Sequence, residues 1–271
     1  MTVRRLLPVL GIAVMLAGLW FPLYWMVISS FTPEARLFAP TLVPREVVLD
    51  HYRALFGGRD FWTPIRNSLI VAGATTALSV GLGALCAYAL ARLQFRGKPL
   101  MLAFVLAISM FPQISIVSPL YLLLREVRLI NTYPGLVLPY LTFAMPLTIW
   151  LLVGFFRQLP AELEEAAMMD GASRLRTLRE IILPLAWPGL ATTAILTFLY
   201  CWNEFLFALS FTLGPERHTV PVAIALFRGQ YQVPWGEILA GAVVATVPVA
   251  VIVLAAQRRI VAGLTAGAVK G

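Results

Sequence analysis

Six long stretches of the chain carry no charged side chain, and the charged residues are concentrated between them. The stretches cover residues 6–33, 67–91, 99–124, 129–156, 181–203 and 238–257, and the fifth continues past one acid, Glu204, to Pro215. Each is long enough to cross a bilayer, which takes about 20 apolar residues. Buried helices of soluble proteins seldom run so far without a charge. The pattern therefore predicts an all-α membrane protein with six transmembrane helices.

The first stretch has a second interpretation, because Arg4 and Arg5 precede it in the way that basic residues precede the apolar core of a signal peptide. Its apolar character extends beyond the length of such a core, without a convincing small-residue cleavage site. Trp20, Tyr24 and Trp25 suit the interface between membrane and water. We therefore expect a membrane helix, and a signal peptide is the alternative.

The basic residues between the stretches predict the orientation, because loops rich in Lys and Arg are retained on the cytoplasmic side. The denser set is Arg4, Arg5, Arg92, Arg96, Lys98, Arg157, Arg174, Arg176, Arg179, Arg258, Arg259 and Lys270. The longer connections hold Arg36, Arg45, Arg53, Arg59, Arg66, Arg125, Arg128, Arg217 and Arg228. We expect both termini, the turn at 92–98 and the segment 157–184 in the cytoplasm.

Composition and charge agree with a membrane protein and exclude other classes. The chain is 60% hydrophobic and 13% charged, and its net charge of +8 is spread over many loops, so a nucleic-acid partner is not expected. Cys86 and Cys201 lie within apolar stretches, which argues against a disulfide framework or a zinc site. His51 and His218 lie in predicted outer loops, where we expect solvated side chains and no metal.

Proline and small residues indicate a bent and tightly packed bundle, as transport pathways often require. Clusters of small residues at 71–91 and 240–250 predict close helix packing. The outer region 32–66 mixes Pro and Gly with one short helical pattern, which predicts a small ordered loop instead of a separate domain. The prolines within the predicted helices are Pro112, Pro119, Pro139, Pro146 and Pro248.

The segment 157–184 is charged and helix-forming, unlike the apolar stretches on either side. Pro160 suits the start of a helix, and Glu162, Glu164 and Glu165 follow where a helix N-terminus favours negative charge. Gly171 can take the left-handed conformation that closes a helix, so the first helix should end near Asp170. A helix–turn–helix follows from this pattern.

The second helix of the segment should begin after Ser173, whose hydroxyl can cap it, and end at Pro184. Ala166 and Ala167 give the first helix a thin face that can enter a groove on another protein, with Glu165 beside them to pair with a base. An amphipathic segment on the membrane surface is the alternative. A DNA-reading helix–turn–helix does not fit, because both ends continue into membrane stretches.

The segment resembles the EAA loop of ABC importer permeases. Its matching positions are Glu165, Ala166, Ala167, Gly171, Ile181, Leu183 and Pro184, at the spacing that the loop requires. The stretches LDHYRALF at 49–56, IRNSLIVA at 65–72, CWNEF at 201–205 and the C-terminal QRRIVAGLTAGAVKG resemble the MalG-type carbohydrate permeases of binding-protein-dependent systems. The resemblance extends over essentially the whole chain.

This resemblance implies a multi-pass permease subunit in a bacterial or archaeal plasma (inner) membrane. It implies four partners besides the lipid bilayer: a second permease subunit, two ATPase subunits and an extracytoplasmic sugar-binding protein. It divides the chain into an N-terminal helix and outer loop (1–65), a permease core of five helices containing the EAA loop at 157–184 between spans four and five (66–260), and a cytoplasmic tail (261–271). The residues expected to couple to the ATPase are Glu165, Ala166, Ala167, Asp170, Gly171, Ile181, Leu183 and Pro184.

The chain itself carries no recognisable catalytic pattern. Its lysines are Lys98 and Lys270, and neither belongs to the glycine-rich loop that binds nucleotide phosphates. No Ser/His/Asp set or carboxylate pair converges in the sequence. We therefore expect no enzyme activity and no cofactor in this chain, with ATP and magnesium bound by the partner ATPase that the resemblance implies.

One acid lies within the apolar stretches, and such a residue is a candidate for function. It is Glu204, between Asn203 and Phe205, and with Trp202 and Asn203 it is a candidate for the substrate path or for bracing a helix. The predicted function is sugar import, with a di- or oligosaccharide such as maltose or trehalose as substrate. The alternatives are a permease for glycerol phosphate or another polyol, a self-sufficient secondary transporter, and an assembly protein without transport activity.

Overall fold

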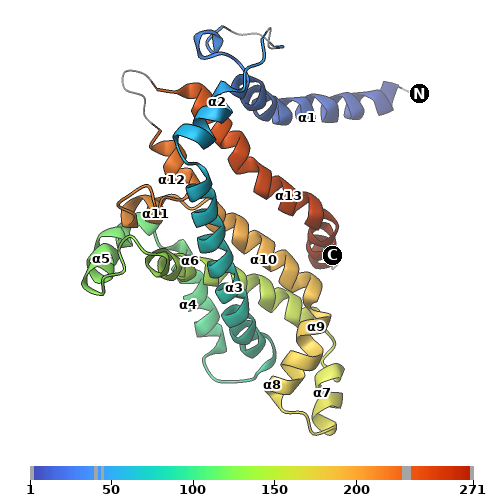
Figure 1. Ribbon diagram of the computed structural model, residues 1–271. Helices are drawn as coiled ribbons and strands as arrows, with labels where there is room; N and C mark the ends of the chain where they lie inside the picture. The colour runs from blue at the N-terminus through green and yellow to red at the C-terminus, as the bar shows by residue number, and fades with distance from the viewer. Residues whose placement is uncertain (1–2, 40–41, 44–45, 228–232, 269–271) are drawn as a thin grey trace. The chain divides into compact units, whose positions relative to one another are not determined.

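The computed structural model describes residues 3–39, 42–43, 46–227 and 233–268, and its side chains are described between residues 8 and 257 of these ranges. Within them the chain forms helices, turns and loops and no strand (Figure 1). The elements are α1 (Val3–Ser30), η1 (Glu34–Arg36), α2 (Asp50–Arg53), η2 (Ala54–Gly58), α3 (Trp62–Arg92), α4 (Lys98–Met110), α5 (Gln113–Glu126), α6 (Tyr133–Gln158), α7 (Glu162–Met169), α8 (Arg174–Thr177), η3 (Leu178–Ile182), α9 (Leu183–Leu185), α10 (Trp187–Trp202), α11 (Leu206–Phe211), α12 (Val220–Ala225) and α13 (Trp235–Ala268).

Four helices of the described chain are long and apolar enough to cross a membrane alone. They are Pro8–Ser30, Trp62–Arg92, Tyr133–Gln158 and Trp235–Gln257. The third and fifth predicted stretches differ from the expectation, because each forms two helices that meet at a sharp bend. The bend is 91° between α4 and α5, and 79° between Arg174–Leu185 and α10. If each bent pair makes one crossing, the described helices supply up to six spans.

The bend between α4 and α5 has a local cause in Pro112. A residue that precedes proline is driven out of the helical region, and Phe111 is extended with ψ 133°. Pro112 is also extended, with ψ 116°, and α5 begins at the next residue. By contrast, Pro139 and Pro146 are accommodated inside α6. A proline therefore breaks one predicted span and leaves another continuous.

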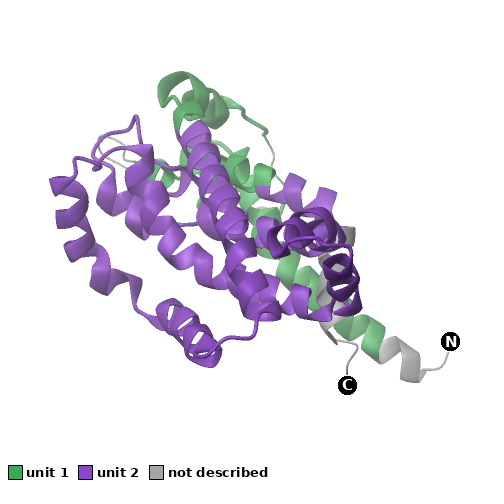
Figure 2. Cartoon of the chain, turned by 90° about the horizontal axis from the view of Figure 1, so that it is seen from below, with its two compact units in different colours: residues 1–63, 222–248 green, residues 64–221, 249–271 purple. Residues whose placement is uncertain are grey.

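The described chain divides into two compact units (Figure 2). Unit 2 comprises residues 64–221 and 249–271, and in it α6 packs against both α10 and α4, while α11 packs against α5 and α6. Its core is an apolar cluster with members from α3, α6, η3 and α10. The predicted close packing at 71–91 is confirmed, since Ala87 is fully buried and a Cβ on Gly83 would lie 2.8 Å from Cγ2 of Thr148.

Unit 1 comprises residues 1–63 and 222–248, and it contains the outer loop 32–66 up to Thr63. The Glu34 carboxylate accepts hydrogen bonds from the backbone N–H of Trp235 (3.1 Å) and Gly236 (3.0 Å) at the start of α13. Arg59 pairs with Glu237 in the same turn. These contacts confirm the expectation of an ordered loop, because they tie it to a long helix.

The expectation of a solvated histidine is wrong for His51. Its side chain is buried, and Nε2 lies 2.9 Å from the carbonyl oxygen of Thr32. The imidazole occupies space that only a glycine at position 236 leaves open, because a Cβ there would meet the ring. His218 is half-buried. Local polarity in the sequence did not reveal the long-range contact that buries His51.

Candidate functional site

The segment 157–184, called the EAA segment below, forms the predicted helix–turn–helix. Its first helix, α7, ends in a Schellman arrangement in which Ala172 N–H donates to the Ala167 carbonyl (2.9 Å) and Gly171 N–H to the Met168 carbonyl (3.0 Å). Gly171 has φ +79°, the left-handed conformation that glycine adopts without steric cost. The predicted end of α7 near Asp170 is therefore confirmed.

The second half of the segment begins as predicted and ends differently. Ser173 caps α8 by accepting a hydrogen bond from Arg176 N–H. Pro184 does not end the helical segment, which continues through α9 to Leu185 and breaks at Ala186. The preceding turn, η3, is a wider π-helix in which Leu183 N–H bonds to the Leu178 carbonyl. Widening this turn gives room for the proline ring, which would otherwise clash with a carbonyl of the turn before it.

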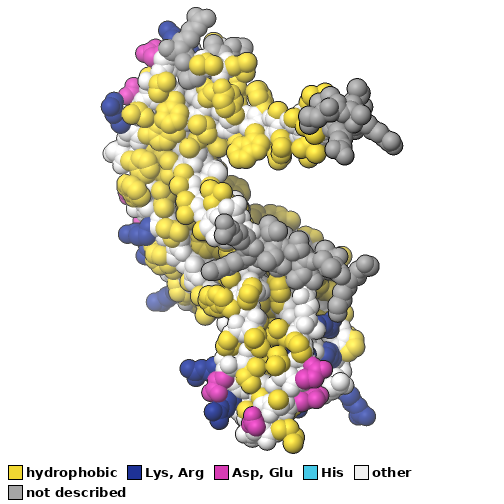
Figure 3. Space-filling view, turned by 90° about the vertical axis from the view of Figure 1, so that its right-hand side faces the viewer, with side chains coloured by type: hydrophobic (Ala, Val, Ile, Leu, Met, Phe, Trp, Pro, Cys, Tyr) yellow, Lys and Arg dark blue, Asp and Glu magenta, His cyan; other side chains and the backbone are white. Residues whose placement is uncertain are grey.

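The predicted coupling residues fall on two sides of the segment. Glu165, Ala166, Asp170, Gly171 and Pro184 are exposed, Ile181 and Leu183 are half-buried, and Ala167 is buried. Figure 3 shows acidic and basic side chains gathered at the end of unit 2 that carries α7 and α8. Among them lie bare apolar side chains, since Met169 is 88% exposed. An outward face with the exposed Ala166, the exposed acids Glu165 and Asp170 and the exposed Met169 is suited to contact another protein.

Sequence reasoning missed the role of Glu164, the neighbour of Glu165. Its side chain is only 11% exposed, and Oε1 lies 2.8 Å from Nε of Arg92 at the last residue of α3. Oε2 accepts a hydrogen bond from the Tyr88 hydroxyl (3.2 Å). Arg92 also donates from Nη2 to the carbonyl oxygen of Leu159 (2.5 Å). The sequence signal is Tyr88 and Arg92, which are four residues apart and so share one face of a helix.

The second half of the EAA segment is fastened by apolar contacts. Leu178 and Ile182 of η3 are buried in the core cluster of unit 2, together with Leu90 of α3 and Phe156 of α6. The two side chains are four residues apart and so share one face of the helical segment, whereas Leu175 is 66% exposed. The segment is thus joined to α3 by an ion pair in its first half, and to α3 and α6 by packing in its second.

The three candidate substrate-path residues have different surroundings. Trp202 is buried and stacks on Phe198, with ring centroids 5.7 Å apart. Asn203 is exposed, and its Nδ2 donates to the Leu199 carbonyl (2.8 Å). The buried Glu204 carboxylate accepts from the backbone N–H of Phe207 (2.8 Å) and Ala208 (3.2 Å), so it caps the start of α11. Of these side chains, Asn203 is the accessible one.

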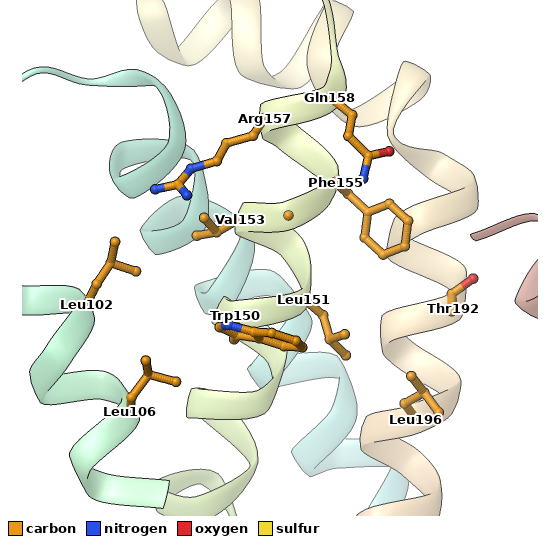
Figure 4. Close-up of a pocket in the computed structure, with 11 residues that line it drawn as sticks. Leu102, Leu106, Trp150, Leu151, Val153, Phe155, Arg157, Gln158, Thr192 and Leu196 are labelled. Atoms are coloured by element: carbon orange, nitrogen blue, oxygen red, sulfur yellow. The ribbon is translucent and has the colours of Figure 1, made fainter. Parts of the chain in front are cut away.

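A cavity of about 420 Å³ lies among α4, α6 and α10 of unit 2. Figure 4 shows Leu102 and Leu106 of α4 on one side of Trp150, and Leu196 of α10 on the other. Its polar members are Arg157, Gln158 and Thr192, and the candidate substrate-path residues do not line it. A site for a hydroxyl-rich molecule needs several converging polar groups. The cavity therefore does not supply a sugar site in this arrangement.

A polar cluster around the loop that follows α11 orders another part of unit 2. Asn131 donates from Nδ2 to Oε1 of Glu216 (2.7 Å) and accepts at Oδ1 from Leu213 N–H (3.1 Å). The hydrogen bond from Asn131 lowers the pKa of the Glu216 carboxyl, because it stabilises the charged form. Asn67 of α3 donates to the backbone carbonyls of Glu216 (3.0 Å) and His218 (2.9 Å). Side-chain hydrogen bonds thus hold the loop after α11 in place.

Comparison with known proteins gives consistent results. Residues 79–265 match the family model described as binding-protein-dependent transport system inner membrane component. The trehalose transport system permease protein SugB of Mycobacterium tuberculosis is 49% identical over 252 residues, covering 92% of each chain. The trehalose/maltose transport system permease protein MalG of Thermococcus litoralis is 42% identical over 271 residues, covering 99% of this chain and 98% of the relative.

The fold also has a solved counterpart. A bacterial ABC transporter involved in the import of the acidic polysaccharide alginate contains a chain that matches with a TM-score of 0.80, at 21% identity, over 94% of this chain and 96% of that one. At this identity the likeness shows the fold. The family match and the two relatives show that the chain is a component of a transporter and not an enzyme. The chain belongs to the family of inner membrane components of binding-protein-dependent transport systems.

Proposed function

We propose that this chain is a permease subunit of an ATP-driven importer of a di- or oligosaccharide such as trehalose or maltose. The observation that carries the proposal is the 49% identity to a trehalose permease over 92% of the chain, joined by the 42% identity to a trehalose/maltose permease. Family membership alone leaves the substrate open, because one fold serves many substrates. Glycerol phosphates and other polyols are therefore outcomes of the test and not part of the proposal.

In this proposal the chain forms a complex with a second permease subunit, two ATPase subunits and an extracytoplasmic sugar-binding protein. The family description names dependence on a binding protein. ATP and magnesium belong to the ATPase subunits, since the sequence has no phosphate-binding loop of its own. In this arrangement hydrolysis and translocation occur in different chains, so a mechanical contact must join them.

The EAA segment is that contact, with Glu165, Ala166, Ala167, Asp170, Gly171, Ile181, Leu183 and Pro184 as the coupling residues. Support comes from its rigid cap at Gly171 and from its exposed alanine, acid and methionine. A short helix with a thin face can enter a groove on a partner. A displacement of α7 then reaches α3 through the Glu164–Arg92 pair, and reaches α3 and α6 through the buried side chains of η3.

Six crossings, with each bent helix pair counted as one, place both termini in the cytoplasm together with the turn 92–98 and the EAA segment. Basic residues are denser in these connections than in the others. In the membrane, Asn203, Glu204 and Trp202 remain the residues proposed for the substrate path. Asn203 would contact sugar hydroxyls, while Glu204 and Trp202 would hold α10 and α11 around it.

The test is reconstitution of the complete complex in proteoliposomes with its binding protein. Trehalose or maltose should stimulate ATP hydrolysis and accumulate in the lumen, whereas glycerol 3-phosphate and mannitol should do neither. Uptake by this chain alone, driven by an ion gradient, would refute the proposal. So would stimulation of hydrolysis by a glycerol phosphate and by no sugar.

A further inference from the structure

The acidic residues of α7 face two ways, although they are neighbours in sequence. Glu165 is exposed and free to meet a partner, whereas the Glu164 side chain is 11% exposed and points into unit 2. Successive residues of a helix differ in direction by about 100°, so one short helix can present one acid outward and one inward. The inward acid has no part in the docking surface and needs an explanation of its own.

Two groups of α3 converge on Glu164. Nε of Arg92 lies 2.8 Å from one carboxylate oxygen as an ion pair, and the Tyr88 hydroxyl donates a hydrogen bond to the other at 3.2 Å. The same guanidinium holds the carbonyl oxygen of Leu159, which follows the last residue of α6, at 2.5 Å. One arginine thus joins the end of α3, the end of α6 and the first turn of α7.

The electrostatic arrangement suits this junction. Arg92 lies at the C-terminus of α3, where a helix favours positive charge, and Glu164 lies in the first turn of α7, where negative charge is favoured. A buried ion pair gives less net stability than well-packed apolar side chains would, because both charges lose water. It does fix direction and register, because the close contact between the two charges and the hydrogen bond from the Tyr88 hydroxyl to Glu164 are both lost when α7 slides against α3.

We propose that Arg92 and Glu164 form a strut through which displacement of the EAA segment is transmitted to α3. The proposal rests on the proposed function, in which an ATPase grips the exposed side of α7. Glu164 and Arg92 are positioning residues, because they touch neither nucleotide nor transported sugar. Without the strut, α7 would still dock, while its motion would be taken up by slippage against α3.

The experiment measures sugar transported per ATP hydrolysed in proteoliposomes that contain the complete complex. Glu164→Gln keeps the size of the side chain and a hydrogen-bond acceptor for Tyr88 and removes the ion pair. We expect the transport-to-hydrolysis ratio to fall about fivefold, the lower end of measured coupling between sites, with the ATPase still co-purifying. Arg176→Gln is the matched control, because it breaks an exposed ion pair in the same segment. The side chains of this pair, Arg176 and Glu180, are 65% and 56% exposed. The transport-to-hydrolysis ratio of this variant should equal that of the wild type.

An unchanged ratio in Glu164→Gln overturns the proposal, and so does a lower melting temperature without a lower ratio, which would indicate a purely stabilising pair. If Glu164→Gln does not assemble, Arg92→Gln decides, since it removes the ion pair from the side of α3 and leaves the hydrogen bond from Tyr88 to Glu164. A lowered ratio in Arg92→Gln supports the strut, and an unchanged ratio overturns it. Failure of the proposed function is recognised separately, because Glu165→Lys would then leave ATPase co-purification intact.

Discussion

Gly171 offers a substitution whose cost follows from backbone conformation alone. Its φ is +79°, and a Cβ built at this position meets no atom within 4 Å. A substitution therefore creates no clash with other residues, and its penalty is that of holding an L-residue in the left-handed region, about 1–2 kcal/mol. Gly171→Ala and Gly171→Leu should lose nearly the same stability, and Gly171→Asn less, because asparagine tolerates this conformation.

Thermal unfolding of the purified chain in detergent measures this loss. With about 2–4 °C of Tm per kcal/mol for a chain of this size, the alanine variant should melt about 2–8 °C below the wild type. Gly81→Ala in α3 is the matched control, since its Cβ also meets no atom within 4 Å and its φ is not positive; it should melt at or above the wild-type temperature. Equal melting of both variants, or a leucine variant far less stable than the alanine variant, would refute the conformational argument.

Three further predictions concern other parts of the molecule. Glu165→Lys should abolish co-purification of the ATPase without lowering Tm, because it reverses an exposed charge in the proposed contact; pull-down measures this. Gly83→Ala should cost about 1–3 kcal/mol in thermal unfolding, because its methyl group would lie 2.8 Å from Cγ2 of Thr148. Since the pKa of Glu216 is lowered by Asn131, its stabilising effect is present above the usual carboxyl pKa of about 4.3 and is lost as pH falls through the folded-state value. The Tm advantage of the wild type over Glu216→Gln should accordingly vanish in acid, and an advantage that grows there would contradict the assignment.

The local features of the EAA segment could be predicted because they depend on neighbouring residues. The closing turn at Gly171 and the cap at Ser173 use interactions that span three to five residues, and the structure shows both. The predicted break at Pro184 lies one residue before the observed end at Leu185, because the rule that proline ends a helix assumes a regular preceding turn. The π-helix at Leu178–Ile182 removes that assumption.

Contacts between distant residues were beyond sequence reasoning. The partners of Glu164 lie 72 and 76 positions away, at Arg92 and Tyr88, so only the packing of α7 against α3 brings them together. The burial of His51 has the same origin, since its neighbour Glu34 reaches the start of α13. In each case the sequence near the residue gave no sign of its partner, which long-range packing supplied.

The apolar pattern located the helices but not their bends. Runs without charge correctly marked helices such as α6, which continues through two internal prolines. In the run 99–124 the pattern was equally uniform, and yet Pro112 and the extended residue before it turn the chain by 91°. Hydrophobicity reports the solvent that a segment prefers, and the path of the backbone depends on packing that the pattern does not encode.

The central claim is that the EAA segment of this chain touches an ATPase in the assembled importer. Met169 is the best position for a cross-linker, because it is 88% exposed at the end of α7. A photoreactive amino acid at position 169 should form a covalent adduct with the ATPase subunit when the complete complex is illuminated in membranes. Adducts with lipid or with the extracytoplasmic binding protein, and none with an ATPase, would contradict the account.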